Sequence, residues 1–472
     1  MFFNRVFCSL ALLSLAICGC ETYQARPLAT QDIIDKVERA RHFIDEPVAG
    51  NSRPESTPSK EVSFTRAATL MAEHNPALKE ADAEYQSALA LAHVKTPLPN
   101  PSVEVGPRFG FGTDVIRRRV EPFGSIGFAI PTGKRLKRMD ELNRINAEAA
   151  HVEYVAKYRE TYLALRKAYA ELALSRMRMS TRKTILEAAD KTSALNKKNF
   201  ESGQITAADT VLFDLEAGRI KGESMDMQLE IAGTEATLAD LVGVSADVLR
   251  ELPEVSQPGI PAAIPSNGEL IQILTANHLE LARIRMKYEV AEAELRLEIA
   301  RQYPDFKFGT SGEGDINDRK TLLGLTLGID IPIFDRNQQG IAAAKGKRDA
   351  VRAKYEAAAS RALSGLERAR RLVELTSEKL NFLRQELLPK ANQSVELSQK
   401  AVDAGAIDSF RVLENQRAQR AVLLSIVDAE LALRRAWVDL EQAVGHPMML
   451  FPEEKQDALP ILPDTAKMEI EK

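Results

Sequence analysis

Two long stretches of the chain place apolar and small residues at alternating steps of three and four positions. The first runs from Pro131 to about Phe200, roughly 65 residues, which as a helix would measure on the order of 100 Å. The repeating positions are Leu142, Ile145, Ala149, Val152 and Ala156 in the first stretch and Tyr355, Ala358, Ala362, Gly365, Ala369 and Leu372 in the second. This spacing predicts long helices that pack along a coiled-coil seam.

Each long stretch is interrupted by a polar turn that contains glycine. The turns read KKNFESGQITAADTVL over residues 197–212 and QKAVDAGAIDSFRVL over residues 399–413, with Gly203 and Gly405 in corresponding places. Because glycine reverses a helix without backbone strain, each turn predicts a hairpin of two long helices.

Short glycine-rich segments with alternating apolar residues precede both helical hairpins. These segments span residues 102–112, 123–131, 305–312 and 322–332. Their period of two predicts two β-hairpins. Helical sequence also runs from Phe64 to about Lys95, and Asp335 with Gln338 has the spacing of a helix-capping box.

The second half of the chain repeats the plan of the first. Six pairs of landmark residues are separated by 201–203 positions: Asn75 and Asn277, Pro101 and Pro304, Pro131 and Pro332, Tyr154 and Tyr355, Gly203 and Gly405, and Gly243 and Gly445. So constant an offset indicates an internal duplication.

The repeat divides the chain into six parts. They are a signal peptide at 1–19, an N-terminal tether at 20–61, a first repeat at 62–252 (β-hairpin 102–131, helical tip 201–206), a proline-rich linker at 253–267, a second repeat at 268–445 (β-hairpin 305–332, helical tip 403–408) and a C-terminal tail at 446–472.

The outward positions of the predicted strands are apolar. They are Val103, Val105, Phe109, Phe111, Phe128, Ile130, Leu323, Leu325, Leu327 and Ile329. In a membrane every backbone polar group must be paired, so only a closed sheet is allowed there. Four strands cannot close around a pore, which predicts that several chains share one barrel.

The first twenty residues have the composition of a secretory signal. Arg5 provides a positive charge, an apolar segment follows, and Ile17-Cys18-Gly19-Cys20 resembles the lipobox of bacterial lipoproteins. The resemblance implies a mature protein that starts with lipid-modified Cys20, and Glu21 after it favours sorting to the outer membrane.

Composition argues against an enzyme and against a nucleic-acid-binding protein. Aromatic residues make up 6% of the chain, the formal net charge is −4, and no basic run points to nucleic acid. The six histidines are scattered, all three cysteines lie in the first twenty residues, and no phosphate loop or nucleophile elbow occurs. We therefore expect no catalytic site, no metal site and no cofactor other than the covalent lipid.

The duplicated layout, the proline-terminated strand-to-helix turns and the two glycine tips resemble the TolC family of outer-membrane efflux channels. The resemblance covers Phe64 to Gly445. The turns IPTGKR and IPIFDRNQ, at residues 130–135 and 331–338, are similar to those of the cation-efflux branch, which works with resistance-nodulation-division pumps.

The resemblance implies a mainly α fold with a small β part. Three chains would form a homotrimer with a periplasmic α-barrel of helical hairpins and a shared twelve-stranded transmembrane β-barrel, four strands from each. This homotrimer would sit in the outer membrane of a Gram-negative bacterium. Its function would be a passive conduit, fed by an inner-membrane pump through a periplasmic adaptor.

The resemblance also implies a gate at the periplasmic tips, Gly203 and Gly405. In the family, acidic residues six and nine positions after the second glycine constrict the tunnel; here those positions hold Arg411 and Glu414, and Asp209 corresponds to the former in the first repeat. Asp408 lies in the same second tip. The mixed pair has two interpretations: a ring that locks the closed state through salt bridges, or a surface pair of little energetic weight.

The cargo stays open at this stage. The turns favour metal cations, whereas drugs and a secreted polypeptide are alternatives for the same channel. A periplasmic coiled-coil structural lipoprotein is an alternative of another class, although it leaves the apolar strands without a role.

Overall fold

The structure, a computed structural model, describes residues 23, 25, 28–42, 64–110, 119–203, 206–246, 259–261, 263–315, 320–403 and 409–449. It divides the chain into two units, Met1–Arg53 and Pro54–Lys472. In the first unit, helix α2 (Thr30–His42) is exposed over residues 30–39.

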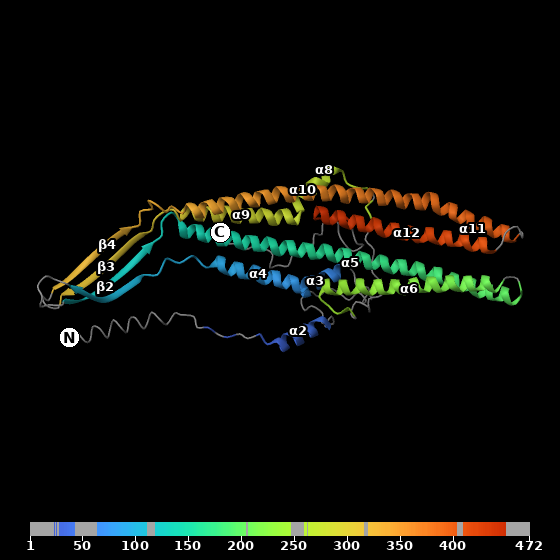
Figure 1. The fold of residues 1–472 in the computed structure, drawn as a ribbon, viewed down its shortest axis with the longest axis horizontal. Coiled ribbons are helices and arrows are strands. Elements are labelled where there is room, and N and C mark those ends of the chain that lie inside the picture. The colour runs from blue at the N-terminus through green and yellow to red at the C-terminus, as the bar shows by residue number, and fades with distance from the viewer. Residues whose placement is uncertain are drawn as a thin grey trace, which may run out of the picture. The chain divides into compact units, whose positions relative to one another are not determined.

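Long helices and one four-stranded sheet make up the described part of the second unit (Figure 1). The helices are α3 (Phe64–His74), α4 (Pro76–His93), α5 (Arg135–Glu201), α6 (Ala207–Val242), α8 (Asn267–Asn277), α9 (Leu279–Ala300), α10 (Gln338–Phe382), α11 (Leu388–Asp403) and α12 (Ser409–Val444). The strands are β1 (Ser102–Gly110), β2 (Arg119–Ile130), β3 (Phe306–Asp315) and β4 (Lys320–Ile329). The predicted fold class, mainly helical with a small sheet, is confirmed.

The longest helix, α5, runs for 67 residues without glycine or proline. It ends at Glu201, with Ser202 as the C-cap, and Gly203 follows with a φ of +72°, a left-handed conformation that glycine adopts without strain. The chain then returns as α6 along α5, and α11 returns as α12, so that the tips of both hairpins lie at the same end of the unit (Figure 1).

Both repeats interrupt the helix that precedes their β-hairpin. The helix predicted from Phe64 to Lys95 is in fact two helices, because Asn75 caps the N-terminus of α4 and Pro76 has no backbone N–H to donate to α3. His278 caps α9 in the same way after Asn277.

The last glycine of each repeat packs against the backbone at the break between these two helices. Gly243 has a φ of +83°, and an added Cβ would lie 2.7 Å from the carbonyl oxygen of His74. Gly445 has a φ of +74°, and its Cβ would lie 2.4 Å from the carbonyl oxygen of Asn277. The duplication therefore extends from sequence to backbone contacts.

The second hairpin contains one irregularity that the first lacks over its described residues. A π-helical turn, Leu383–Leu387, separates α10 from α11 and ends two residues before Pro389. Proline has no N–H for the carbonyl four residues earlier, and a wider turn accommodates this missing donor.

The sheet is an antiparallel meander in the order β1-β2-β3-β4. It lies at the end of the long helices opposite their tips (Figure 1). Within the described residues, no helix is both long enough and apolar enough to cross a bilayer.

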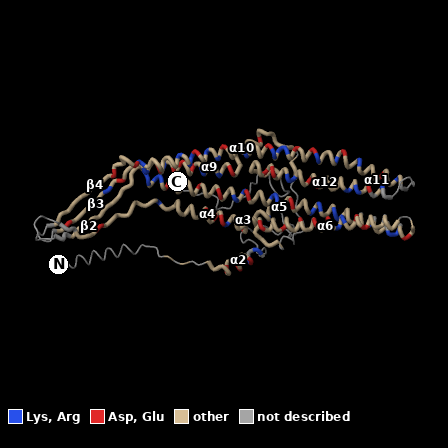
Figure 2. The backbone as a smooth tube through the Cα atoms, in the orientation of Figure 1, with Lys and Arg blue, Asp and Glu red and all other residues tan. Residues whose placement is uncertain are grey.

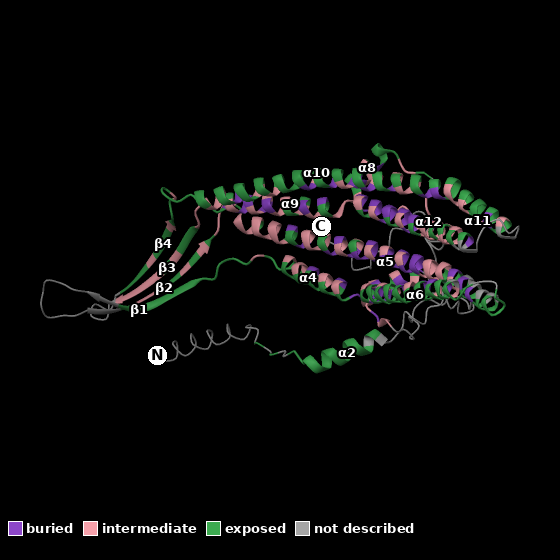
Figure 3. Cartoon of the chain, turned by 45° about the vertical axis from the view of Figure 1, so that its right-hand side comes forward, coloured by how far each residue is buried: buried purple, intermediate pink, exposed green. Residues whose placement is uncertain are grey.

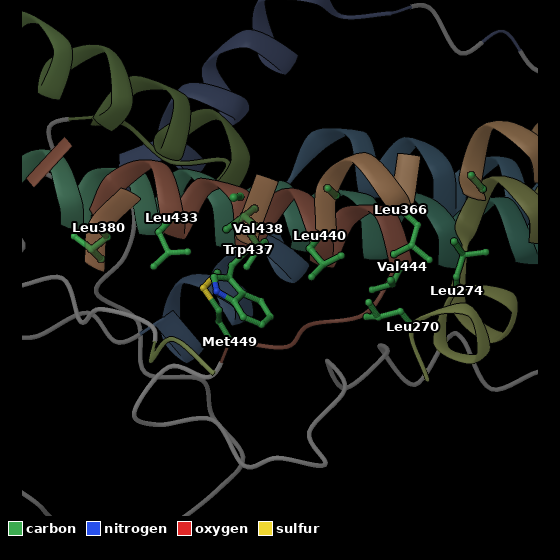
Figure 4. Close-up of a cluster of buried hydrophobic side chains, with 14 of the residues drawn as sticks. Leu270, Leu274, Leu366, Leu380, Leu433, Trp437, Val438, Leu440, Val444 and Met449 are labelled. Atoms are coloured by element: carbon green, nitrogen blue, oxygen red, sulfur yellow. The ribbon is translucent and has the colours of Figure 1, made fainter. Parts of the chain in front are cut away.

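The main apolar core lies where α8, α10 and α12 meet. Trp437 is 2% exposed and packs beside Met449, and Leu270 and Leu366 extend the same cluster (Figure 4). Buried residues continue along α5 and α12 toward the tips (Figure 3). In the seam predicted on α10, Ala358, Ala362 and Ala369 are buried, whereas Tyr355 and Leu372 at its two ends are exposed.

Candidate functional site

The sheet has two chemically different faces. One row across the four strands consists of Val103, Ile126, Thr310 and Leu325, and a neighbouring row of Phe128, Phe308 and Leu327. The alternate rows consist of Ser102, Gly127, Gly309 and Thr326, and of Glu104, Ser125, Ser311 and Gly324. Because side chains alternate across a strand, the apolar rows share one face and the small polar rows share the other.

None of the residues that the structure describes covers the apolar face. Val105 is 81% exposed, and Leu323 and Leu325 are 87% and 80% exposed. All the outward strand residues that the sequence predicted are exposed in the structure, except Phe109 and Phe111, whose side chains lie outside its description. The strands carry few charges in comparison with the long helices (Figure 2). A sheet with one apolar and one small polar face suits a position between lipid and water.

The strand-to-helix turns connect the two repeats. The Thr132 hydroxyl donates to the carbonyl of Pro304 at 2.5 Å, and the Arg135 guanidinium lies 2.8 Å from the Asp305 carboxylate. The helices after the turns begin alike, because Lys134 and Asn337 both have left-handed φ angles, of 60° and 56°.

The capping box predicted at Asp335 and Gln338 is wrong. Gln338 is the first residue of α10, so it cannot occupy the third helical position that a capping box requires. Instead, the Asp335 carboxylate accepts from the backbone N–H of Asn337 at 2.8 Å, and the Gln338 side chain accepts from the N–H of Arg336 at 2.9 Å.

The predicted gate residues lie at the tips. Gly203 occupies the first tip, Asp209 lies in the first turn of α6, and Arg411 is exposed in the first turn of α12. Gly405 and Asp408 lie outside the described residues, as does Cys20. The gate role of these residues stays a prediction.

Glu414 does not pair with Arg411 within the chain. Its carboxylate accepts from the Arg417 guanidinium at 2.8 Å. Arg411 and Arg417 are each three residues from Glu414. An acidic residue pairs better with a basic residue on its C-terminal side in a helix, which favours Arg417. The surface-pair interpretation of Arg411 with Glu414 is therefore wrong for the single chain.

Arg417 leads to a buried carboxylate that sequence analysis missed. Glu216 on α6 has a side chain only 8% exposed and lies 2.9 Å from Arg219, 3.3 Å from Arg417 and 3.6 Å from Arg420. The last two arginines belong to α12, so Glu216 connects the two helical hairpins. Its position on the packed side of α6, next to apolar Phe213 and Ile220, was the signal available in the sequence.

The arginines around Glu216 set its protonation state. Hydrogen bonding to Arg219, reinforced by the charges of Arg417 and Arg420, lowers the pKa of the Glu216 carboxyl below its ordinary value of 4.5. Glu216 therefore remains ionised over the ordinary pH range and holds α12 electrostatically.

A second buried ion pair joins the repeats nearer the middle of the helices. Arg166 on α5 and Glu441 on α12 are 1% and 0% exposed and lie 3.5 Å apart. The Glu441 carboxylate also accepts from the N–H groups of Met448 and Met449, both at 2.6 Å. The pair thus fixes the chain beyond α12 against the first repeat.

No group of three or more potential ligand side chains that could hold a metal ion occurs in the described parts of the chain.

Comparison with known proteins agrees with this architecture. Residues 270–446 match the family described as "Outer membrane efflux protein". The cobalt-zinc-cadmium resistance protein CzcC of Cupriavidus metallidurans is 23% identical over 248 residues, which is 52% of this chain and 58% of that protein. The alignment thus spans less than two thirds of this relative's length.

Solved structures share the fold over most of the chain. A membrane protein from Pseudomonas aeruginosa has a TM-score of 0.67 at 16% identity, covering 84% of this chain and 97% of its own. The outer-membrane channel OprN has a TM-score of 0.66 at 17% identity, covering 85% and 97%. The family description and the name of OprN refer to efflux proteins and channels rather than to enzymes, in agreement with the prediction that this chain is not an enzyme. Together, the family match over the second repeat and the shared fold confirm the resemblance to the TolC family of outer-membrane efflux channels.

Proposed function

We propose that this protein is the outer-membrane conduit of a tripartite efflux system for divalent metal cations. Three copies would close their sheets into one shared wall of twelve strands, with the apolar face toward lipid and the small polar face toward the water of the pore. The two-faced sheet carries this proposal, because a sheet with an open apolar face needs both a partner and a lipid surface.

The edges of the sheet support closure between copies. β1 and β4 are the edge strands and run in opposite directions in the four-stranded meander. A further copy can therefore add its β1 to β4 in the same antiparallel pattern, and an even number of strands per chain lets a ring of copies close.

The proposal that the cargo is a metal cation rests on similarity to known proteins. The cation-efflux character of the two strand-to-helix turns and the name of the cobalt-zinc-cadmium resistance protein point to the same cargo. A periplasmic adaptor and a resistance-nodulation-division pump would deliver the cation, and a lipid on Cys20 would add a second membrane anchor.

Metal accumulation in a strain that lacks this protein tests the proposal. After exposure to cobalt, zinc or cadmium, we expect the strain to retain several times more metal than the parent by mass spectrometry, and the full chain supplied in trans to restore the parental level. Normal metal content together with sensitivity to dyes or antibiotics would contradict metal cargo and support a drug channel. Normal behaviour on both, with a defect in a secreted polypeptide, would support the secretion alternative.

A further inference from the structure

A cavity of about 320 Å³ lies between the two helical hairpins, on the tip side of the molecule's centre. Residues of α5, α6, α11 and α12 line it: Thr184, Ile185, Ala189, Phe213, Glu216, Val395, Gln416, Gln419, Arg420 and Leu423. A space of this size is at the lower end of the range that binds small organic molecules.

The lining of the cavity is divided between apolar and polar groups. Ile185, Ala189 and Phe213 are buried apolar residues of the first hairpin. Gln416 and Arg420 lie one helical turn apart on α12, and both are half-buried. A molecule in the cavity would therefore meet an apolar surface on one side and a guanidinium with an amide on the other.

The ion pairs around the cavity leave positive charge in excess. The connected set contains four arginines, Arg182, Arg219, Arg417 and Arg420, and three glutamates, Glu216, Glu223 and Glu414. Glu223 pairs with two of these arginines within the first hairpin, and Glu414 pairs with Arg417. The excess positive charge of the set therefore falls on Arg420.

Arg420 is weakly neutralised for a half-buried guanidinium. Its ion pair among the described residues is the 3.6 Å contact with Glu216, a carboxylate that lies nearer to two other arginines. Its Nε donates to the backbone carbonyl of Gln416 at 3.2 Å. Burial lowers the pKa of Arg420, as do the charges of Arg417 and Arg219, while the charge of Glu216 acts in the opposite direction.

From these observations we infer that the cavity is a binding site for a small amphipathic anion, whose carboxylate or comparable group pairs with Arg420 while its apolar body contacts Ile185, Ala189 and Phe213. Such a ligand supplies the negative charge that the cluster lacks and excludes water from the apolar wall. The inference does not depend on which cargo the conduit carries.

Ligand-observed fluorine NMR on the full-length trimer in lipid nanodiscs tests the inference, with 6-fluoro-2-naphthoate as the probe. We expect saturable binding of the naphthoate and a loss of affinity on the order of tenfold in Arg420→Gln. The neutral analogue 6-fluoro-2-naphthamide should also bind at least several times more weakly. Arg352→Gln removes an exposed arginine on α10 and serves as the matched control, with unchanged binding.

Three results would overturn the inference. These are no saturable binding of the naphthoate to the wild type, equal binding of the naphthoate and its amide, or unchanged affinity in an assembled Arg420→Gln trimer. If that variant does not assemble, a photoreactive naphthoate on the wild type decides the matter. Labelling must then fall on the peptides that contain residues 184–189 and 416–423, and labelling elsewhere contradicts the site.

Discussion

Near the tips, ion pairs made by Glu216 connect the two helical hairpins. Its carboxylate belongs to α6, and two of its three arginine partners belong to α12. Replacing a buried carboxylate and its partners together by apolar groups often changes stability little. Removing the carboxylate alone destabilises the protein, because the charge of its partners is then uncompensated. Loss of Glu216 would leave three arginines facing one another between the hairpins.

We therefore expect Glu216→Gln to loosen the tips and raise the closed-state conductance of the channel in planar bilayers severalfold at neutral pH. Glu223→Gln is the matched control, because the Glu223 carboxylate pairs with Arg182 and Arg219 of the first hairpin alone. Equal conductance in both variants would show that the link between the hairpins does not restrain the tips.

The wild type should reproduce the effect of Glu216→Gln at low pH. Because the folded-state pKa of Glu216 lies below its ordinary value of 4.5, the stabilisation from its charge is present above that value. It is lost as the pH falls through the lower, folded pKa. Conductance of the wild type recorded from pH 7 to pH 3 should thus rise only below pH 4.5, whereas that of Glu216→Gln should change much less over this range.

The buried pair Arg166–Glu441 allows a prediction about stability. Glu441→Ala leaves Arg166 charged in a site that is 1% exposed, and it removes the acceptor of two backbone N–H groups. A cost of about 3–5 kcal/mol is expected. Thermal denaturation followed by circular dichroism should show a clearly lower apparent melting temperature than the wild type, with Glu441→Gln between them because its amide oxygen still accepts.

At the scale of elements, glycines divide into those that the backbone requires and those that it tolerates. Gly445 has a positive φ and no room for a Cβ next to Asn277. Gly346 lies within α10, and nothing lies within 4 Å of an added Cβ there. The same substitution should therefore have opposite effects at the two positions.

Gly445→Ala should destabilise the protein by about 2 kcal/mol or more, through both strain and collision. Gly346→Ala should stabilise it by about 0.5–1 kcal/mol, because alanine favours a helix. Apparent melting temperatures of the two variants, measured side by side, check the signs. A Gly445→Ala protein as stable as the wild type would mean that the end of α12 can move away from Asn277.

The order of elements could be predicted from the sequence because prolines and glycines mark most of the turns and the 201–203 residue offset relates the two repeats. The interruption at Asn75 could also have been found, since an N-cap residue followed by proline starts a helix. The contact of Glu216 with Arg417 could not be predicted from the sequence, because it depends on which faces of α6 and α12 meet. The roles of Arg411 and Glu414 depend on neighbouring copies, so neither one sequence nor one chain determines them.

At the scale of the whole assembly, the sheet is the part that most requires other copies. Its apolar face is exposed and its edge strands, β1 and β4, pair on one side only within the chain. Exposed apolar edges are prone to aggregation unless another strand covers them. Pairing of β4 with β1 of the next copy would satisfy the unpaired edges, and the apolar face of the closed sheet would then contact lipid.

Disulfide trapping can test this pairing cleanly, because the chain has no cysteine after Cys20. With Leu325→Cys on β4 held constant, a second cysteine is placed in turn at each of residues 102–107 of β1. We expect one register to give covalent dimers and trimers on non-reducing gels, since trapping between copies links each chain to two neighbours. The pair Phe128→Cys and Phe308→Cys, which face each other within one chain, is the control and should give only monomers. Monomers at every position of the scan, with an efficient control, would contradict a sheet closed between copies.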